Sequence, residues 1–307
     1  MNTPDILVIG AGPAGLTAGL YGARSGHSTV VLERALPGGQ VALTSEVENY
    51  PGFAEPIQGM ALTQAMEAQA RRFGCTVETG EVSGIAAETG GLVVSTTAGE
   101  YRPRTAIIAS GVISKQLGLD REDALRGRGV SYCAVCDGPL FRGKEVAVVG
   151  GGDSALDETL YLAGICSRVH LIHRRDEFRG NKTAQDRLVK LPNVVFHLSA
   201  QVTALTGEKR LESIDITSRK DNAVTNLPVS GLFIYVGSVP NTTWCRGVVT
   251  LDELGFVVAD NRLRTNVPGL FAAGDVRVTP LRQIATAVAD GALAAMSAHD
   301  YLSGSAH

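Results

Sequence analysis

The 307-residue chain contains five cysteines, and only Cys133 and Cys136 stand close together in the sequence. Two cysteines separated by two residues can close a small disulfide ring, and the same spacing can lower the pKa of one thiol enough to give a working thiolate. Asp137 follows directly, and its carboxyl group could carry a proton when the ring opens or closes, although an acid here also suits a turn or a helix start. The motif therefore predicts redox chemistry.

Two other interpretations of the cysteine pair remain open, namely half of a zinc site and an inert buried pair. A structural zinc ion normally needs four ligands, and the sequence holds no second C-x-x-C motif. The histidines are scattered along the chain as His27, His170, His173, His197, His299 and His307. The remaining cysteines fit small core or surface residues better than catalysts, and they are Cys75, Cys166 and Cys245.

A glycine fingerprint, G-x-G-x-x-G, stands near the N-terminus as Gly10, Gly12 and Gly15. It lies between an apolar strand pattern and a helix pattern that ends near Gly26, and Glu33 follows at the end of a second expected strand. In dinucleotide-binding folds such glycines bring backbone N–H groups to a pyrophosphate, and an acid at this distance binds the adenosine ribose. The alternative is an ordinary glycine-rich turn with a solvated glutamate.

The same strand, turn and helix pattern recurs 140 residues later with the fingerprint Gly150, Gly152 and Ala155. Here the position of the acid is taken by a basic run, His173, Arg174 and Arg175, with Arg179 shortly after. Guanidinium groups attract a 2′-phosphate through charge-assisted hydrogen bonds, whereas a carboxylate would repel it. The second copy therefore predicts NADPH rather than NADH, unless the run is only a solvated charged turn. The difference between the copies favours two unlike dinucleotides.

The composition is that of a globular protein, with 44% hydrophobic and 19% charged residues. Glycine is abundant, at 36 residues, which fits tight turns and backbone packed against phosphates. The net charge of −3 gives no basic field for a nucleic-acid backbone. Because no apolar run approaches the roughly 20 residues of a membrane span and no export leader is present, we expect a cytoplasmic protein without a membrane partner.

These elements predict an α/β fold with two Rossmann-like (three-layer ββα) dinucleotide-binding domains, one inserted into the other. The C-terminal stretch from Thr265 to Asp275 has no glycine fingerprint of its own, and an Ala-rich helix pattern follows it to about Ser297. We therefore assign residues 1–114 and 246–307 to a discontinuous first domain and residues 115–245 to the inserted domain.

Nearly end to end, the chain resembles the low-molecular-weight (bacterial-type) thioredoxin reductases. The resemblance rests on the glycine loops, on Cys133–Asp137 and on the order of seven further motifs: 37–40 (Pro-Gly-Gly-Gln), 48–52 (Glu-Asn-Tyr-Pro-Gly), 105–111, 173–179, 231–237, 271–275 (Phe-Ala-Ala-Gly-Asp) and 282–283 (Arg-Gln). It implies FAD in the interrupted domain and NADPH in the inserted one. It further implies a homodimer whose protein substrate is thioredoxin.

The resemblance also assigns residues to each role. Electrons would pass from NADPH through FAD to the Cys133–Cys136 disulfide and on to oxidised thioredoxin, with Cys136 facing the flavin, Cys133 attacking the partner disulfide and Asp137 as acid and base. The implied FAD residues are Gly10, Gly12, Pro13, Ala14, Gly15, Glu33, Arg34, Gly39, Gln40, Asn49, Ala109, Gly111, Gly274, Asp275, Arg282, Gln283 and Ile284. The implied NADPH residues are Gly150, Gly152, Asp153, Ser154, Ala155, His173, Arg174, Arg175 and Arg179, and no metal is expected.

The chain is expected to cross between the domains near residues 111–114 and 240–243. Because the nicotinamide site and the cysteine pair share one domain but must reach the same flavin, we hypothesise that the inserted domain swings about these two crossings. One alternative function is a related flavin-dependent dithiol oxidase, against which the arginine pair weighs, or a reductase of another thioredoxin-like or small disulfide. A ferredoxin–NADP reductase relative would lack the cysteine pair. A non-catalytic nucleotide-binding module would lack a flavin spectrum.

Overall fold

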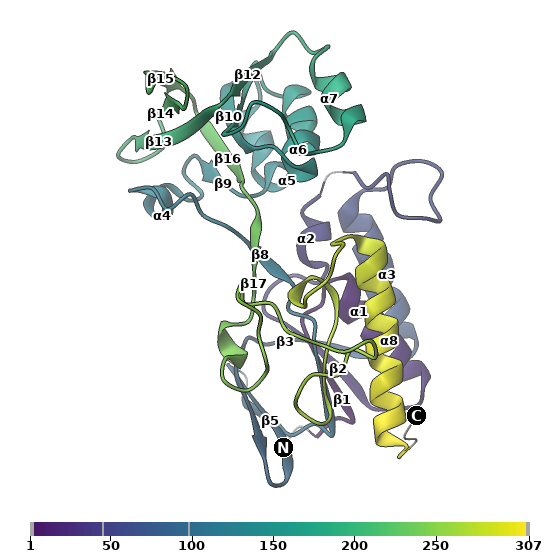
Figure 1. Ribbon diagram of the computed structural model, residues 1–307. Coiled ribbons are helices and arrows are strands. Elements are labelled where there is room, and N and C mark those ends of the chain that lie inside the picture. The colour runs from purple at the N-terminus through teal and green to yellow at the C-terminus, as the bar shows by residue number, and fades with distance from the viewer. Residues whose placement is uncertain (1–2, 45, 98, 305–307) are drawn as a thin grey trace. The chain divides into compact units, whose positions relative to one another are not determined.

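Successive side chains of a strand point to opposite faces of its sheet, and the central strands here are buried on both faces. In strand β1 (Ile6–Ile9), Ile6 and Val8 belong to one apolar cluster while Leu7 and Ile9 belong to another. The structure is a computed structural model that describes residues 3–44, 46–97 and 99–304 (Figure 1). The chain divides into two compact units, Met1–Ile113 with Val239–His307, and Ser114–Ser238.

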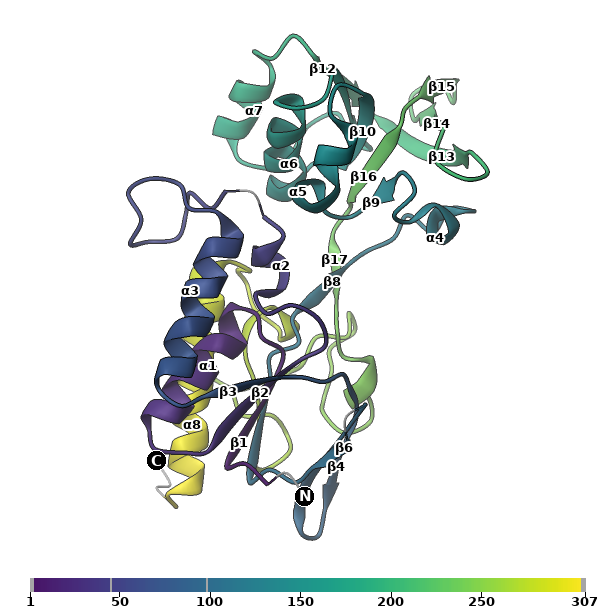
Figure 2. The same cartoon turned by 180° about the vertical axis from the view of Figure 1, so that it is seen from behind.

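The first unit is built on a parallel sheet in the order β18–β7–β1–β2–β3. The strands beside β1 are β2 (Thr29–Glu33), β3 (Thr76–Thr79), β7 (Thr105–Ile108) and β18 (Leu270–Ala272). Three helices lie side by side and share the cluster on one face (Figures 1 and 2), namely α1 (Pro13–Arg24), α3 (Gly59–Arg72) and α8 (Ile284–Leu302). Short helices are α2 (Gly39–Ala42), η2 (Thr243–Cys245) and η3 (Gly274–Val276).

An antiparallel sheet covers the other face of this parallel sheet. Its strands are β4 (Val82–Glu88), β5 (Gly91–Thr96) and β6 (Gly99–Tyr101). Val94 and Tyr101 from these strands are buried in the cluster that holds Leu7 and Ile9. The unit therefore has three layers: helices, parallel sheet and antiparallel sheet.

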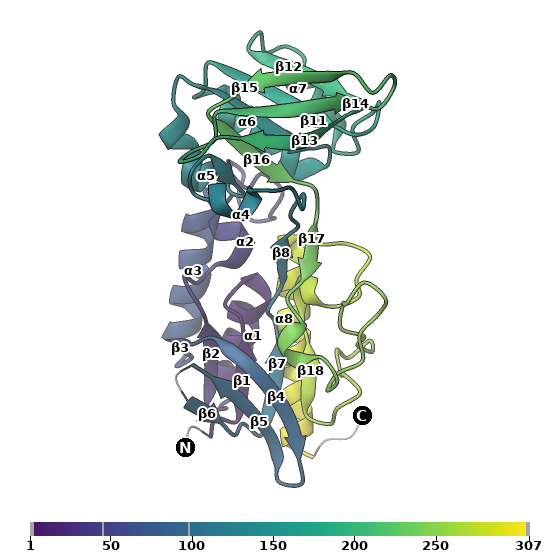
Figure 3. The same cartoon turned by 90° about the vertical axis from the view of Figure 1, so that its left-hand side faces the viewer.

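The second unit repeats this arrangement with the parallel order β12–β11–β10–β16–β9. The strands are β9 (Val130–Ser131), β10 (Glu145–Gly150), β11 (Arg168–His173), β12 (Val194–Leu198) and β16 (Gly231–Tyr235). Helices on the unit are α4 (Glu122–Leu125), α5 (Ala134–Asp137), η1 (Gly138–Phe141), α6 (Asp153–Ala163) and α7 (Lys182–Leu188). Figure 3 shows its antiparallel sheet of β13 (Ala200–Thr206), β14 (Ser213–Ser218) and β15 (Val224–Pro228). The predicted α/β fold with two Rossmann-like sheets is confirmed.

The two crossings of the chain between the units pair with each other as β8 (Val112–Ser114) and β17 (Ser238–Pro240). The inserted domain was expected to end after Cys245, whereas the second unit ends at Ser238. The physical reason is packing, because Cys245 is fully buried in the same apolar cluster as Leu7 and Ile9 of the first unit. Sequence patterns mark turns and strands but do not show which core a short helix joins.

Candidate active site

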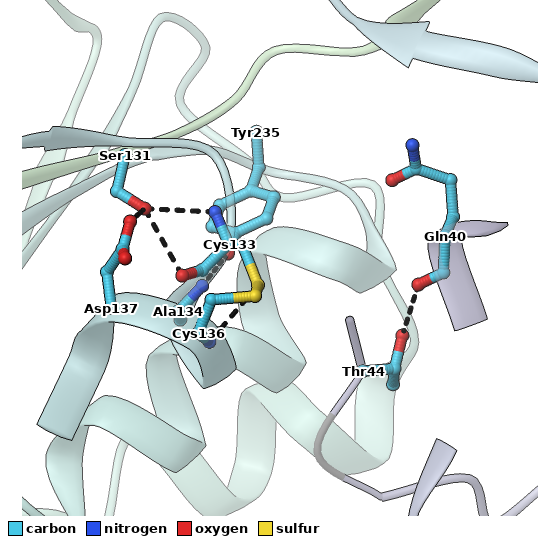
Figure 4. Close-up of a disulfide and its surroundings, with 8 residues drawn as sticks. All are labelled: Gln40, Thr44, Ser131, Cys133, Ala134, Cys136, Asp137 and Tyr235. Atoms are coloured by element: carbon cyan, nitrogen blue, oxygen red, sulfur yellow. Dashed lines mark hydrogen bonds between the residues drawn. A yellow bond between two sulfur atoms is a disulfide. The ribbon is translucent and has the colours of Figure 1, made fainter. Parts of the chain in front are cut away.

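The two closely spaced cysteines are joined in a disulfide at the start of helix α5 (Figure 4). Cys133 is the N-cap residue, and its Cα atom lies 5.4 Å from that of Cys136. The backbone N–H of Cys136 donates a hydrogen bond to the Sγ atom of Cys133 over 3.1 Å. A hydrogen bond to an ionised acceptor is stronger than one to a neutral acceptor, so a bond of this kind would favour a thiolate at Cys133 in a reduced pair. Cys136 is exposed and Cys133 is half-buried.

Asp137 is connected to the cysteine pair through a serine that the sequence did not single out. The hydroxyl of Ser131, at the end of β9, donates to Asp137 Oδ2 over 2.6 Å and accepts from the N–H of Cys133 over 3.1 Å. Figure 4 shows Ser131 between the carboxylate of Asp137 and the backbone of Cys133. Ser131 thus links the carboxylate of Asp137 to the backbone of Cys133.

A second unpredicted residue, Tyr235, fixes the first turn of α5. Its hydroxyl accepts a hydrogen bond from the N–H of Ala134 over 2.8 Å, and it lies at the end of β16. Burial and the nearby carboxyl of Glu158 raise the pKa of Tyr235, so the phenol stays protonated. The tyrosine lies inside the 231–237 motif, but nothing in that motif indicated a contact with the cysteines.

The first glycine loop has the shape of a phosphate cradle. Gly10 has φ +107°, and a Cβ atom there would lie 2.4 Å from the carbonyl oxygen of Ala109. A Cβ atom on Gly15 would lie 1.8 Å from the carbonyl oxygen of Gly10. A Cβ atom on Gly12, by contrast, would have the Cα atom of Gly39 as its nearest neighbour, at 4.0 Å. The backbone is therefore open at the start of the 12-residue helix α1. Loop and helix therefore fit a dinucleotide pyrophosphate, with Pro13 and Ala14 in the first turn of the helix.

Glu33 lies against this loop, at the end of β2. Its Oε2 atom accepts from the N–H of Ala11 over 2.9 Å, and its Oε1 atom accepts from the N–H of Ala35 over 3.2 Å. The carboxylate thus holds the loop in place, and each oxygen keeps acceptor capacity for a ribose hydroxyl. The neighbouring Arg34 is exposed.

The other predicted flavin residues lie at the ends of elements in the same unit. Asn49 donates to Gln283 Oε1 over 3.0 Å, which joins residues far apart in the sequence. Gln283 is the N-cap of α8 and forms a capping box with Thr286, so Ile284 begins the helix. Gln40 donates to the carbonyl oxygen of Val112 over 3.2 Å, close to Gly111 in the sequence.

Asp275 lies in the turn before α8, next to Gly274. Burial raises the pKa of Asp275, and the Arg282 guanidinium opposes this effect. Arg282 itself lies 4.1 Å above the ring centroid of Phe256. The Nε atom of Arg282 also donates to the carbonyl oxygen of Asp275 over 3.5 Å, just before α8 begins.

An ion pair that the sequence did not predict holds this turn. Asp290 Oδ2 accepts from the N–H of Gly274 over 3.0 Å and from Arg277 Nε over 2.6 Å, while Oδ1 accepts from Arg277 Nη2 over 2.8 Å. Asp290 is 8% exposed. Its place in an Ala-rich helix pattern gave no indication of a polar role.

The second glycine loop lies between β10 and α6. Gly150 has φ +158°, and a Cβ atom there would lie 2.5 Å from the carbonyl oxygen of Tyr235. At Gly152, the N-cap of α6, no described atom lies within 4 Å of such a Cβ, so the helix start is open. Asp153 Oδ1 accepts from the N–H of Asn181 over 2.7 Å, and Ser154 and Ala155 follow in the first turn. This loop fits a second dinucleotide.

The basic run after β11 separates into two kinds of residue. His173 is 5% exposed, its ring stacks on Phe178 with centroids 5.5 Å apart, and a Cβ atom on Gly151 would lie 2.4 Å from it. Burial and three nearby arginines lower the pKa of His173, so the ring is neutral and supports the loop from within. The arginines are exposed, and they are Arg174, Arg175 and Arg179.

The other cysteines are buried, unbonded thiols, and they are Cys75, Cys166 and Cys245. Burial raises the pKa of each to about 11, so they are poor nucleophiles at neutral pH. Over residues 3–44, 46–97 and 99–304 no cluster of three or more histidine, cysteine or acidic side chains is arranged for a metal ion. His307 lies outside the described residues. In that same part of the chain no helix has the length and apolar character to cross a membrane.

Comparisons with known proteins agree with this geometry. Residues 4–291 match the family model "Pyridine nucleotide-disulphide oxidoreductase". The chain is 44% identical over 299 residues to a thioredoxin reductase of Listeria innocua, an alignment that covers 97% of this chain and 93% of the relative. Among solved structures it is similar to thioredoxin reductase from Lactococcus lactis (TM-score 0.95, 40% identity, 98% and 99% coverage) and to that from T. acidophilum (TM-score 0.93, 35% identity, 98% and 99% coverage).

Proposed function

We propose a catalytic cycle for this chain, which belongs to the thioredoxin reductases within the pyridine nucleotide-disulphide oxidoreductase family. It is a disulfide oxidoreductase that reduces the disulfide of thioredoxin. The observation that carries this function is the Cys133–Cys136 disulfide, formed at the start of α5 and exposed at Cys136. The resemblance noted from the sequence is confirmed.

Enzymes of this family use FAD and NADPH, which supply the two-electron relay and the hydride that protein side chains lack. We propose that residues 1–113 and 239–307 hold FAD and that residues 114–238 hold NADPH. Support comes from the open helix starts at Gly12 and Gly152, and from the contrast between Glu33 after the first loop and the exposed arginines after the second. Arg174, Arg175 and Arg179 would bind the 2′-phosphate, and His173 would support the loop.

We propose the following roles for the residues at the disulfide. Reduction of the disulfide consumes two electrons and breaks the S–S bond. It takes up one proton where the Cys133 sulfur stays a thiolate and two protons where both sulfurs become thiols. Asp137, held by Ser131 next to Cys133, moves the proton that leaves or reaches the Cys133 sulfur. The N–H of Cys136 stabilises the resulting Cys133 thiolate.

The Cys133 thiolate then attacks one sulfur of the thioredoxin disulfide, which forms a mixed disulfide and releases the other thioredoxin sulfur as a thiolate that takes up a proton. The Cys136 thiol loses its proton and attacks Cys133 Sγ. This step restores the internal disulfide and releases the second thioredoxin sulfur. Two electrons have then passed to the substrate, and the pair is ready for the next reduction.

The test is an NADPH-coupled assay with a panel of thioredoxins and small disulfides, together with a flavin absorption spectrum. Cys133→Ser and Cys136→Ser should each abolish thioredoxin reduction, while FAD stays bound and is still reduced by NADPH. Cys166→Ala removes a buried thiol of the same unit and should keep turnover. Thioredoxin reduction that persists in both serine variants would refute the proposed role of the pair.

We also propose that the units move relative to each other about the two crossings during turnover, because each dinucleotide loop lies in a different unit. A verified covalent cross-link between the units should block turnover and spare one half-reaction. Full turnover in such a sample would contradict this proposal.

A homodimer is proposed for the assembly, and apolar side chains exposed on α8 support it, namely Leu293, Met296 and Tyr301. Sedimentation should give twice the chain mass, and Met296→Glu should weaken association. A reducing, cytoplasmic location is proposed as well. It fits the three unpaired buried thiols, and cell fractionation would test it.

A further inference from the structure

A buried carboxyl group in the second unit takes no part in the cycle described above. Glu158 lies in helix α6 and is 7% exposed. Its Oε2 atom is buried and has no hydrogen-bond partner in the described part of the chain. An ionised carboxylate in such a place would be costly, so the group favours its neutral, protonated form.

Helix α6, which carries Glu158, packs against the redox helix α5, since Ala134 of α5 and Ala155 and Leu156 of α6 belong to one buried apolar cluster. The hydroxyl of Tyr235 accepts from the N–H of Ala134, in the first turn of α5, and the charge of Glu158 acts on that hydroxyl. Burial raises the pKa of Tyr161, which lies on the same helix, and the charge of Glu158 also acts to raise it. The Tyr161 ring lies 3.1 Å from the position of a Cβ atom built on Gly138. The charge of Glu158 thus acts on two tyrosines that contact the redox segment, Tyr235 at Ala134 and Tyr161 at Gly138.

We propose that Glu158 is a positioning residue whose protonation is coupled to the redox state of the Cys133–Cys136 pair, so that it takes up a proton when the disulfide is reduced. The inference rests on the proposed redox role of the pair. Breaking the S–S bond with two electrons and one proton leaves one thiolate and one thiol, and the thiolate repels a second negative charge nearby. Where Glu158 is ionised in the oxidised protein, reduction therefore brings one further proton onto its carboxylate.

The charges around Glu158 set the pH range of this effect. Burial raises the pKa of Glu158 to about 8, and the exposed Asp157 next to it also acts to raise that pKa. The other groups that face it are Tyr161 from its own helix and Tyr235 from β16, with Asp137 of α5 acting on Tyr235. Below about pH 8 Glu158 is neutral in both redox states, so the additional proton is taken up only at higher pH.

The test is the ratio of dithiol to disulfide in the flavin-loaded protein. It is measured in glutathione redox buffers from about pH 6.5 to 9.5 by alkylation and mass spectrometry. Each additional proton makes the ratio fall a further tenfold per pH unit, which equals about 30 mV for a two-electron couple. The wild-type curve should carry this additional fall above about pH 8, and Glu158→Gln should lack it while matching the wild-type slope at lower pH. A purely structural role for Glu158 would not change the slope.

Asp157→Asn is the matched control, since it removes an exposed carboxylate from the adjacent position. It should keep the steeper section of the curve and move its onset to slightly lower pH. Identical slopes in wild type and Glu158→Gln would overturn the inference and leave the proposed function intact. Absence of thioredoxin reduction by the wild type in the NADPH-coupled assay would be the separate result that refutes the proposed function.

Infrared difference spectroscopy on the wild type provides a measurement that does not depend on the folding of a variant. Reduction at about pH 8.5, above the pKa of Glu158, should produce a carboxylic acid C=O band. Glutamate labelled with ¹³C should shift that band, and its absence would also overturn the inference.

Discussion

The buried ion pair between Arg277 and Asp290 allows a quantitative test of how the first unit is held together. Their side chains are 19% and 12% exposed, and the carboxylate accepts three hydrogen bonds, one of them from Gly274 at the predicted flavin site. Asp290→Asn keeps the side-chain volume but leaves one acceptor oxygen for three donors and a buried guanidinium without its counter-charge. Removing one partner of a buried pair costs about 3–5 kcal/mol.

For a unit of this size 1 kcal/mol corresponds to roughly 2–4 °C, so Asp290→Asn should lower the melting temperature by about 6–20 °C. FAD should also bind more weakly, because the Gly274 turn is no longer held by the carboxylate. Circular dichroism melting curves and flavin fluorescence on release measure the two effects. Arg277→Met together with Asp290→Asn should recover most of the stability, because no uncompensated charge stays buried and the amide oxygen still accepts from Gly274.

The exposed pair Arg102–Glu88 provides the control, since its side chains are 40% and 53% exposed. Glu88→Gln should change the free energy of unfolding by less than about 1 kcal/mol. If Asp290→Asn melted within a degree or two of the wild type, or if the double variant were no more stable than the single one, the argument from a buried pair would be refuted.

Three further predictions concern the second unit. Arg174→Ala with Arg175→Ala should weaken NADPH binding by about 2 kcal/mol for each charge-assisted hydrogen bond to the 2′-phosphate that is removed. This corresponds to roughly a thirtyfold rise in the KM for NADPH per arginine, with little change in the KM for NADH. An equal effect on both nucleotides would contradict the 2′-phosphate assignment. Gly151→Ala places a Cβ atom 2.4 Å from the His173 ring, so it should destabilise the unit by about 1–3 kcal/mol and weaken NADPH binding. Gly152→Ala, where the space is open, should weaken NADPH binding without lowering stability. Melting curves and NADPH titrations measure the two effects. Burial lowers the pKa of both His170 and His197, whose Nδ1 and Nε2 atoms lie 3.0 Å apart. The unfolded chain therefore binds more protons than the folded chain below about pH 6.5. The stability that depends on the neutral rings should be fully present above that pH and should fall below it by about 1.4 kcal/mol per pH unit and histidine. Melting curves of His170→Gln and His197→Gln that keep the full wild-type pH slope would refute the last prediction.

Much of the fold could be predicted because strands and phosphate loops have local signatures. Glycines at Gly10 and Gly150 mark backbone that a side chain cannot occupy, and the distance to Glu33 or to the arginines follows from the length of one strand, helix and strand. The spacing of Cys133 and Cys136 suffices for a disulfide, since one turn of helix brings the two sulfurs together. The family assignment followed from the order of these local motifs.

Other parts of the site could not be predicted, because they depend on contacts between distant segments. Ser131 reaches Asp137 only because β9 pairs with β16 and ends beside α5, and Tyr235 reaches Ala134 for the same reason. Likewise, Asp290 was hidden in an Ala-rich helix until α8 was packed next to the Gly274 turn. His173, expected beside the arginines, lies inside the loop because its ring fills the space above Gly151.

The sequence alone thus determined the two glycine loops, the redox pair and the insertion of one unit into the other, since each depends on residues near one another in the chain. Only the tertiary structure decided which apolar core Cys245 joins, which side chains support α5 and which carboxyl groups are buried. The physical reason is that burial and hydrogen bonding between distant residues set the protonation and position of a side chain, and neither can be inferred from spacing along the chain.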